Sequence, residues 1–467
     1  MRAQSTEAFA RASVPPAPKR LGTAASVIGG ALLGSVAASA AAFPLFAGVG
    51  NPLRVETEED PVPYAESWSA ASGAWSLAGT QPGARDAPEL VPLQDGHVFV
   101  TGGFWGTESI DTSWLWDPAG GSFASLAAPA MGHECRSAAR LAGEGFEKVV
   151  VTSSSDDMSF GEGAVHGSVF DVAQASWKPI AVARDHAVRT VVPLPSGRAL
   201  FVFAEAAAVW DGKTETWVTP PPAEAPPLNG DGCPNTAWGA LLEGGRALVV
   251  ARVVRPDDAE WAWTWDPATG LLTRADDLQN AISALHVVAK DETFDVRGLY
   301  ARPGGGAALV VDGRVGLVPA SLASIELISG LPSASGVAVA PVAGGKLLLA
   351  GGWHTAMASR DAWLVDLGTK SVQKAPALHH ARWAGGAAAL PDGRVVVAGG
   401  STQTAHFPWS GVTSLVVSLG ALAGVAWIAR RSARPWVVVA SAVAGGFVLA
   451  AVGGTLFLYA AGSAIRG

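Results

Sequence analysis

The stretch Trp116-Asp117-Pro118-Ala119-Gly120-Gly121-Ser122-Phe123 contains the pattern from which the fold can be predicted. Residues that favour β-strands end at an acid, a short Pro/Gly turn follows, and an aromatic residue stands six positions after the acid. This arrangement predicts a tight β-hairpin. We expect the Asp carboxylate to accept a backbone hydrogen bond inside the turn and the aromatic side chain to pack on the sheet layer below.

Further copies of this turn pattern occur along most of the chain. They are Phe170-Asp171 with Trp177, Trp210-Asp211 with Trp217, Trp265-Asp266 with Leu272, Val365-Asp366 with Val372, and Trp68-Ser69 with Trp75. Most neighbouring copies are separated by roughly 40 to 60 residues. A repeat of this length predicts a β-propeller built from four-stranded blades.

A second repeated pattern precedes the turns and reads Ala-Arg-Trp-Ala-Gly-Gly-Ala-Ala-Ala-Leu-Pro-Asp-Gly-Arg-Val-Val-Val-Ala-Gly-Gly over residues 381–400. Residues 84–103 repeat its main features, and in both copies an Arg stands eleven positions before the Gly of the Asp-Gly turn. Shorter copies occupy residues 195–202, 243–250 and 344–352. The pattern predicts an inner hairpin whose second strand ends in Gly-Gly at a crowded position near the propeller axis.

Together, the Leu-Pro-Asp-Gly-Arg-Val-Val-Val-Ala-Gly-Gly strand pair and the Trp-Asp-Pro turn resemble the kelch-repeat family. The resemblance covers most of residues 64–402. It implies an all-β, kelch-type propeller. It implies no particular activity, because this fold serves many functions.

The two patterns together predict seven blades. The segments are 85–123, 133–177, 186–217, 236–272, 297–328, 336–372 and 382–400. The last segment lacks a turn motif, and residues 64–77 have a turn motif but no inner hairpin, so we expect these two pieces to pair and close the ring. The fifth segment lacks both the Asp turn and the Gly-Gly, which leaves six or eight blades open.

Both ends of the chain have the composition of membrane segments. Residues 1–50 combine a basic start with an uncharged apolar run, which predicts either a cleaved signal peptide or a retained anchor helix. An acidic linker is expected over 51–63 and a second linker over 403–410. Transmembrane helices are predicted over 411–429 and 435–461, joined by a basic cytoplasmic turn at 430–434 and followed by a tail at 462–467.

The basic residues that flank these segments predict an orientation. Lys19 and Arg20 favour a cytoplasmic N-terminus, and Arg430, Arg431 and Arg434 favour a cytoplasmic turn. Both place the propeller on the extracytoplasmic side, periplasmic or extracellular, with the bilayer contacted through the C-terminal helices. The abundance of Ala, Gly and Arg suggests a bacterial source.

Composition limits the partners. Charged residues make up 15% of the 467 residues, the net charge is −8 and no basic stripe is present, so we do not expect a nucleic-acid partner. Cys135 and Cys233 could form one disulfide or remain separate thiols.

Loops above the axis of a propeller are the usual place for a ligand. The candidate ligand-binding residues in these loops are His133, Arg136, His186, Arg189, Trp353, His354, His379, His380 and Arg382. Three interpretations stay open for them: packing between blades, contact with an anion or saccharide, and coordination of a metal. We expect no catalytic residue, metal or cofactor.

No Gly-x-Ser-x-Gly, His-Glu-x-x-His or P-loop motif occurs in the sequence. The expected function is a membrane-anchored extracytoplasmic scaffold that binds a protein or a glycan. One alternative is a carbohydrate-active enzyme that uses the axial His, Arg and carboxylate residues. The other is a structural component of the envelope.

Overall fold

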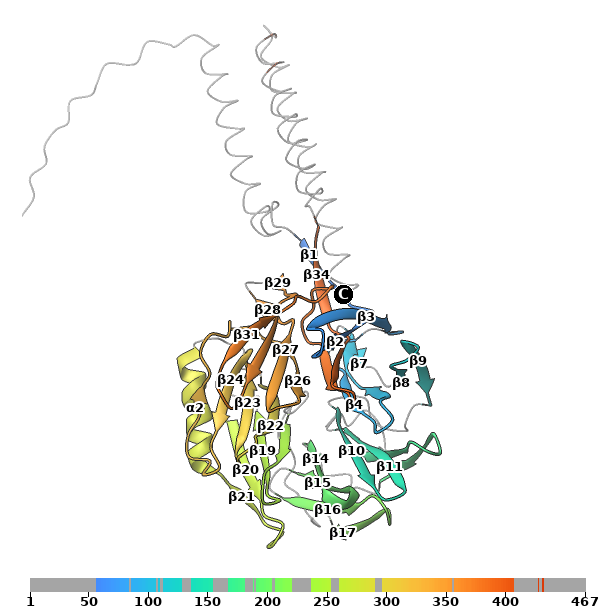
Figure 1. Ribbon diagram of the computed structural model, residues 1–467, viewed down its shortest axis with the longest axis vertical. Helices are drawn as coiled ribbons and strands as arrows, with labels where there is room; N and C mark the ends of the chain where they lie inside the picture. Colours follow the sequence, from blue (N-terminus) through green and yellow to red (C-terminus); the bar gives the residue numbers. More distant parts are fainter. Residues whose placement is uncertain are drawn as a thin grey trace, which may run out of the picture. The chain divides into compact units, whose positions relative to one another are not determined.

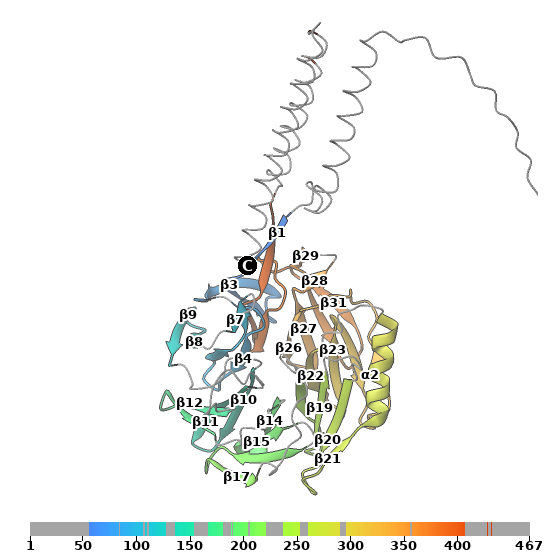
Figure 2. The same ribbon diagram turned by 180° about the vertical axis from the view of Figure 1, so that it is seen from behind.

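Figures 1 and 2 show the computed structural model of the chain, in which a ring of β-sheets contains nearly all of the regular structure. The structure describes residues 56–83, 85–105, 108–109, 112–127, 136–153, 167–180, 188, 190–203, 206–220, 237–252, 260–289, 296–354, 357–406, 427 and 431. The chain divides into two compact units, one of residues 59–404 and one of residues 1–58 with 405–467. The ring belongs to the first unit.

Seven four-stranded antiparallel sheets form the blades of a β-propeller, and six of them are each built from one continuous segment of the chain. Blade 1 contains β4 (Glu89–Pro92), β5 (Val98–Thr101), β8 (Ser113–Asp117) and β9 (Ser122–Leu126). Blade 2 contains β10 (Arg136–Gly143), β11 (Phe146–Ser153), β12 (Gly167–Asp171) and β13 (Ser176–Pro179). Blade 3 contains β14 (Thr190–Leu194), β15 (Arg198–Val202), β16 (Ala207–Asp211) and β17 (Thr216–Thr219).

The remaining blades follow the same order from the axis outward. Blade 4 contains β18 (Ala237–Leu241), β19 (Ala247–Arg252), β20 (Glu260–Trp265) and β21 (Leu272–Arg274). Blade 5 contains β22 (Val296–Ala301), β23 (Ala307–Val311), β24 (Arg314–Val318) and β25 (Glu326–Leu327). Blade 6 contains β26 (Ala338–Val342), β27 (Lys346–Ala350), β30 (Ala362–Asp366) and β31 (Val372–Ala375).

Blade 7 is assembled from both ends of the repeat region. Its strand order is β3 (Ala74–Thr80), β2 (Tyr64–Ser69), β33 (Arg394–Ala398) and β32 (Gly386–Ala389). Trp68 of β2 lies opposite Val395 of β33. The predicted closure of the ring by the N-terminal strands is therefore confirmed, as is the count of seven blades.

Apolar side chains fill every junction between neighbouring blades. Seven buried clusters occur, and each combines residues of two adjacent blades. The cluster between blades 7 and 1, for example, joins Val396 and Ala398 to Val98 and Trp116. Burial of these apolar side chains drives the packing of each blade on both of its neighbours.

The repeated turn forms the hairpin that the sequence predicts. In each copy, the residue before the acid, or before Ser69 in the first copy, lies directly across the ladder from the later residue of the motif. The pairs are Trp68–Trp75, Trp116–Phe123, Phe170–Trp177, Trp210–Trp217, Trp265–Leu272 and Val365–Val372. Asp117 Oδ1 accepts a hydrogen bond from the Ala119 amide at 2.8 Å, and the other four acids make the same kind of bond.

Close approach of the neighbouring blade explains the Gly-Gly that ends the second strand. Gly399 has a φ of +68°, and a Cβ on it would lie 2.5 Å from the carbonyl oxygen of Arg85. At Gly351 a Cβ would lie 2.4 Å from the carbonyl oxygen of Arg382. Only glycine combines this backbone conformation with the space that the next blade leaves.

Blade 5 and the segment before it depart from the repeat. The Asp312-Gly313 turn of blade 5 joins β23 to β24, which is a different position from that of the repeated Asp turn. Before this blade, the helix α2 (Asp276–Ala289) packs Leu278 and Ile282 into the core between blades 4 and 5. The blade patterns did not predict α2, although apolar residues four positions apart and two acids in its first turn are typical of a helix.

Three two-stranded sheets lie at the same position in their blades, after the second strand. One pairs β6 (Phe104–Trp105) with β7 (Glu108–Ser109), and another pairs β28 (Trp353–His354) with β29 (Met357–Ala358). In blade 7 the chain does not turn back but continues into β34 (Ser401–His406), which pairs with β1 (Glu56–Pro61). We call the β1–β34 pair the exit ribbon, because the chain enters and leaves the ring through it (Figure 1).

The predicted signal or anchor over 1–50 lies outside the described residues. Of the predicted helices over 411–429 and 435–461 and the turn at 430–434, the structure describes Trp427 and Arg431. Both have helical backbone, and the Arg431 guanidinium lies 4.5 Å from the centre of the Trp427 ring. Within the described residues we find no helix of the length and apolar character that a membrane crossing requires.

Candidate functional site

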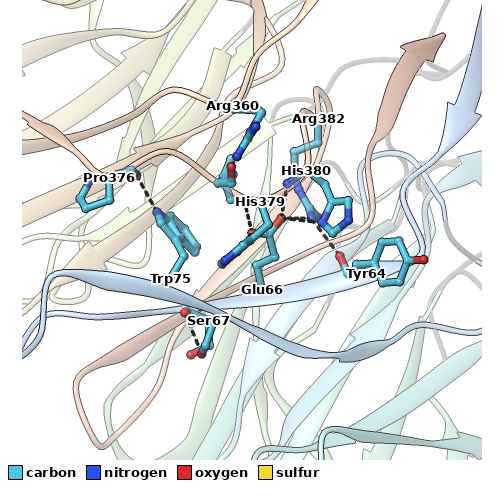
Figure 3. A network of polar contacts seen from close by, with 11 residues as sticks. Tyr64, Glu66, Ser67, Trp75, Arg360, Pro376, His379, His380 and Arg382 are labelled. Carbon is cyan, nitrogen blue, oxygen red and sulfur yellow. Dashed lines mark hydrogen bonds and ion pairs between the residues drawn. The ribbon is translucent and has the colours of Figure 1, made fainter.

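Five of the nine candidate residues gather where blade 6 meets blade 7. His379, His380 and Arg382 lie in the segment that leads into β32, and Trp353 and His354 form β28 of the neighbouring blade. Figure 3 shows the first three together with Tyr64 and Glu66 of β2. We call Tyr64, Glu66, His379, His380 and Arg382 the closure cluster.

The carboxylate of Glu66 is the centre of the closure cluster and has no contact with solvent. Arg382 Nη2 donates to Oε1 at 2.8 Å, and the backbone amides of His379 and His380 donate at 2.6 and 3.1 Å. His379 Nδ1 lies 3.0 Å from Oε2. Burial opposes ionisation of Glu66, but the charge of Arg382 and the two backbone donors outweigh it and lower its pKa.

Arg382 is a packing residue of the repeat. Its Nη1 donates to the carbonyl oxygen of Gly399 at 2.9 Å, and its Nη2 also donates to that of Tyr64 at 2.9 Å. The equivalent Arg85 of blade 1 donates to the carbonyl oxygens of Gly102 and Thr112, both at 2.8 Å. Both arginines are fully buried and bond backbone atoms of their own blade.

The two histidines form the outer part of the closure cluster. The side chain of His379 is 48% exposed, and the His380 ring stacks on Tyr64 with centroids 4.4 Å apart and planes at 21°. Tyr64 is itself exposed. This aromatic and imidazole surface rests on the buried Glu66–Arg382 pair, which holds the segments of both residues in place (Figure 3).

Trp353 and His354 are held by the neighbouring segment. The Trp353 ring meets that of Trp383 edge to face, at 5.4 Å and 68°, and His354 Nδ1 lies 2.8 Å from the carbonyl oxygen of Ser333. Met357, on the other strand of the hairpin, is 60% exposed. The packing interpretation thus describes Trp353, while His354 and Met357 stay accessible.

A small cleft lies between blades 5 and 6 beside this hairpin. Its polar lining includes His354, Ser359 and Asp361, next to the ring of Trp363. Lys374 Nζ pairs with Asp361 Oδ1 at 2.7 Å and lies 5.4 Å from the centre of the Trp363 ring. The lysine therefore occupies the aromatic surface on which a sugar could have stacked.

Of the other four candidates, the structure describes only the backbone of Arg136. His133, His186 and Arg189 lie outside the described residues, as do Cys135 and Cys233. Arg136 begins β10 of blade 2, and its side chain is also outside them. Among the residues that the structure describes, no group of three or more His, Cys, Asp or Glu side chains is arranged to hold a metal ion.

Sequence reasoning missed two carboxyl groups that precede or begin the innermost strand of blade 1. Asp86 is buried and accepts a hydrogen bond from Ser401 Oγ at 2.6 Å. Glu89 begins β4 and is accessible to solvent, and desolvation by the surrounding protein raises its pKa to about 7. The signal that could have found both is their closeness to Arg85, the repeat arginine.

Tyr300 of β22 shares the environment of Glu89. Burial raises the pKa of its phenol, and the charge of Glu89 adds to the effect, so the two groups lie near each other although they belong to blades 5 and 1. Tyr300 Oη donates to the carbonyl oxygen of Val339 at 3.0 Å. This bond links the innermost strands of blades 5 and 6.

No protein-family model matches this chain, and no curated protein is detectably similar to it. The kelch family thus stays a resemblance of motifs. What the geometry establishes is the class: a seven-bladed β-propeller closed by strands from both ends of its repeat region. Propellers of this kind commonly serve as binding scaffolds.

Proposed function

We propose that this protein is a membrane-anchored extracytoplasmic scaffold that binds a protein or a glycan. The observation that carries the proposal is the surface made by Tyr64, His354, Met357, His379 and His380. These side chains are partly or fully exposed, and they belong to blades 6 and 7. Aromatic, His and Met side chains are typical of binding surfaces, and a rigid base lowers the entropy lost on binding.

The position of the exit ribbon supports the anchored part of the proposal. β1 and β34 run side by side, so both connections from the ring leave at one place. The uncharged runs over 411–429 and 435–461 come after β34 in the sequence, and the run before residue 54 precedes β1. A ring tethered at a single place keeps its other surfaces available to a partner.

A protein partner is favoured over a small glycan by the arrangement of these exposed side chains. The cleft beside them is small, and Lys374 lies over the Trp363 ring within it. The exposed side chains instead lie on neighbouring segments, because the Leu378 amide donates to the Arg360 carbonyl oxygen at 2.9 Å and the Arg382 amide to that of Ser359 at 3.0 Å. A partner with a flat apolar surface could contact several of them at once.

The test is a photo-crosslinking experiment on intact cells with the full-length protein. A photoreactive amino acid placed at Met357 or Tyr64 should yield a discrete crosslinked product, and one placed at Leu271, on the turn between β20 and β21, should not. A glycan array probed with the solubilised protein tests the other ligand class. Protease added to intact cells should cleave within 64–402, and protection of this region would contradict the extracytoplasmic orientation.

A further inference from the structure

Three segments of the chain meet at the base of the exit ribbon. The Gly400 amide donates to the carbonyl oxygen of Arg85 at 2.7 Å, and the Val62 amide donates to that of Gly400 at 2.8 Å. Ser401, the first residue of β34, exchanges two backbone hydrogen bonds with Trp383, at 2.9 and 3.0 Å. The ribbon is thereby attached to both blade 1 and blade 7.

Asp86 lies at this meeting point. Its side chain is 4% exposed, and Oδ1 accepts a 2.6 Å hydrogen bond from the hydroxyl group of Ser401. This bond connects the segment that leads into blade 1 with the strand by which the chain leaves the ring. The segment also carries Arg85, whose guanidinium is directed to Gly102 and Thr112.

The charges that face Asp86 come from two other elements. Glu59 of β1 adds a like charge, and Arg297 of β22 adds an opposite one. Burial is the largest influence and raises the pKa of Asp86 to about 6, while the Ser401 hydroxyl and Arg297 lower it and Glu59 raises it further. Asp86 therefore exchanges a proton in a range where most aspartates are already ionised.

We propose that the base of the exit ribbon is a proton-sensitive junction, in which protonation of Asp86 holds β1 and β34 against the ring and ionisation loosens them. The neutral carboxyl keeps the Ser401 hydrogen bond and removes the repulsion from Glu59. The ionised carboxylate is a buried charge whose bonded partner is a neutral hydroxyl, and moving the ribbon away would admit water to it. Acid thus tightens the packing of the exit ribbon on the ring.

The expected size of the effect follows from the pKa difference. If release of the ribbon returned Asp86 to its ordinary pKa of 3.8, the change from about 6 would correspond to an upper limit of roughly 100-fold in the docking equilibrium. The ribbon contributes only part of the burial, so the observed change will be smaller. About tenfold is expected for each unit of pKa that depends on docking.

Hydrogen exchange of the full-length protein in detergent tests the junction. Amides of β1 and β34 should be better protected at pH 5 than at pH 7.5, after correction for the intrinsic pH dependence of exchange. In Asp86→Asn, which keeps the shape and removes the charge, protection at pH 7.5 should reach the level of the wild-type protein at pH 5. Glu59→Gln, at an exposed position, should also raise protection at pH 7.5.

Two matched variants make the test specific. Asp392→Asn removes an exposed carboxylate of blade 7, and Glu89→Gln removes the other carboxyl group with a raised pKa in blade 1; neither should abolish the pH response of the ribbon. The proposal is overturned if wild-type ribbon protection does not change between pH 5 and 7.5, or if Asp86→Asn and Glu59→Gln both keep the wild-type response. Should Asp86→Asn not fold, Glu59→Gln alone decides.

Discussion

Arg382 Nη2 lies 2.8 Å from Glu66 Oε1, although the two residues stand 316 positions apart in the chain. Arg85 makes its equivalent contacts within one continuous blade, through Thr112. In blade 7 the corresponding strand comes from the N-terminal side, so Arg382 reaches Tyr64 and Glu66 across the seam of the ring. A buried ion pair is thus placed where the two ends of the repeat region join.

Loss of the Glu66 charge should destabilise the seam. Glu66→Gln leaves the guanidinium of Arg382 buried without its anion, and we expect the free energy of unfolding to fall by about 3 kcal/mol. The measurement is urea unfolding of the solubilised protein. Asp392→Asn breaks the exposed pair with Arg394 instead and should change stability by less than about 1 kcal/mol. Equal effects of the two variants would contradict a special role of the seam.

Stability should fall as the pH rises from about 4.5 to about 7. Glu89 and Asp86 have folded-state pKa values of about 7 and 6, above the ordinary values of 4.5 and 3.8, so the folded protein binds protons more tightly than the unfolded chain in this window. Glu66 and Asp211 have lowered pKa values, so their protonation destabilises the folded protein only at lower pH. Urea unfolding at pH 5 and 7.5 should show a smaller difference for Glu89→Gln than for the wild-type protein.

Two tryptophans that face each other across one ladder should respond differently to removal of the indole N–H. Trp75 Nε1 donates to the carbonyl oxygen of Pro376 at 2.8 Å and joins blade 7 to blade 6, whereas Trp68 Nε1 is buried without a hydrogen-bond partner. Trp75→Phe should cost about 1 kcal/mol more than Trp68→Phe, because it breaks a hydrogen bond besides removing volume. Thermal melts of both variants, compared with the wild-type protein, measure the difference; a larger loss in Trp68→Phe would rule this explanation out.

Alanine substitutions at two glycines with positive φ in blade 7 should distinguish the cost of backbone strain from the cost of steric contact. A Cβ at Gly393 would meet nothing within 4 Å, so Gly393→Ala should cost about 1–2 kcal/mol from the left-handed backbone alone. At Gly399 the added Cβ also meets the Arg85 carbonyl oxygen, and Gly399→Ala should cost about 1–3 kcal/mol more. Urea unfolding compares them. Equal losses of stability would show that the segment of Arg85, which leads into blade 1, can move aside.

Much of the ring could be predicted because its rules are local. The Asp turn, the paired residue across the ladder and the Gly-Gly end all depend on residues close in sequence, whose backbone preferences act over a few positions. Closure was also predictable, since residues 64–77 and 382–400 each lacked the part that the other supplied. The helix α2 was missed because it interrupts the repeat and follows helix periodicity, which the blade patterns do not contain.

The candidate residues show where local rules end. The repeat arginine at position 382 could be named from its spacing, but its anion, Glu66, occupies a strand position that Trp114 fills in blade 1, and no spacing links it to Arg382. The Asp86–Ser401 bond likewise joins residues 315 positions apart. The local sequence determines the preference of each segment for strand or turn. Burial and charge at a given atom instead depend on which segments surround it. For this protein the repeats alone establish a closed ring of blades, and the packing of its two ends decides which acids are ionised at the seam.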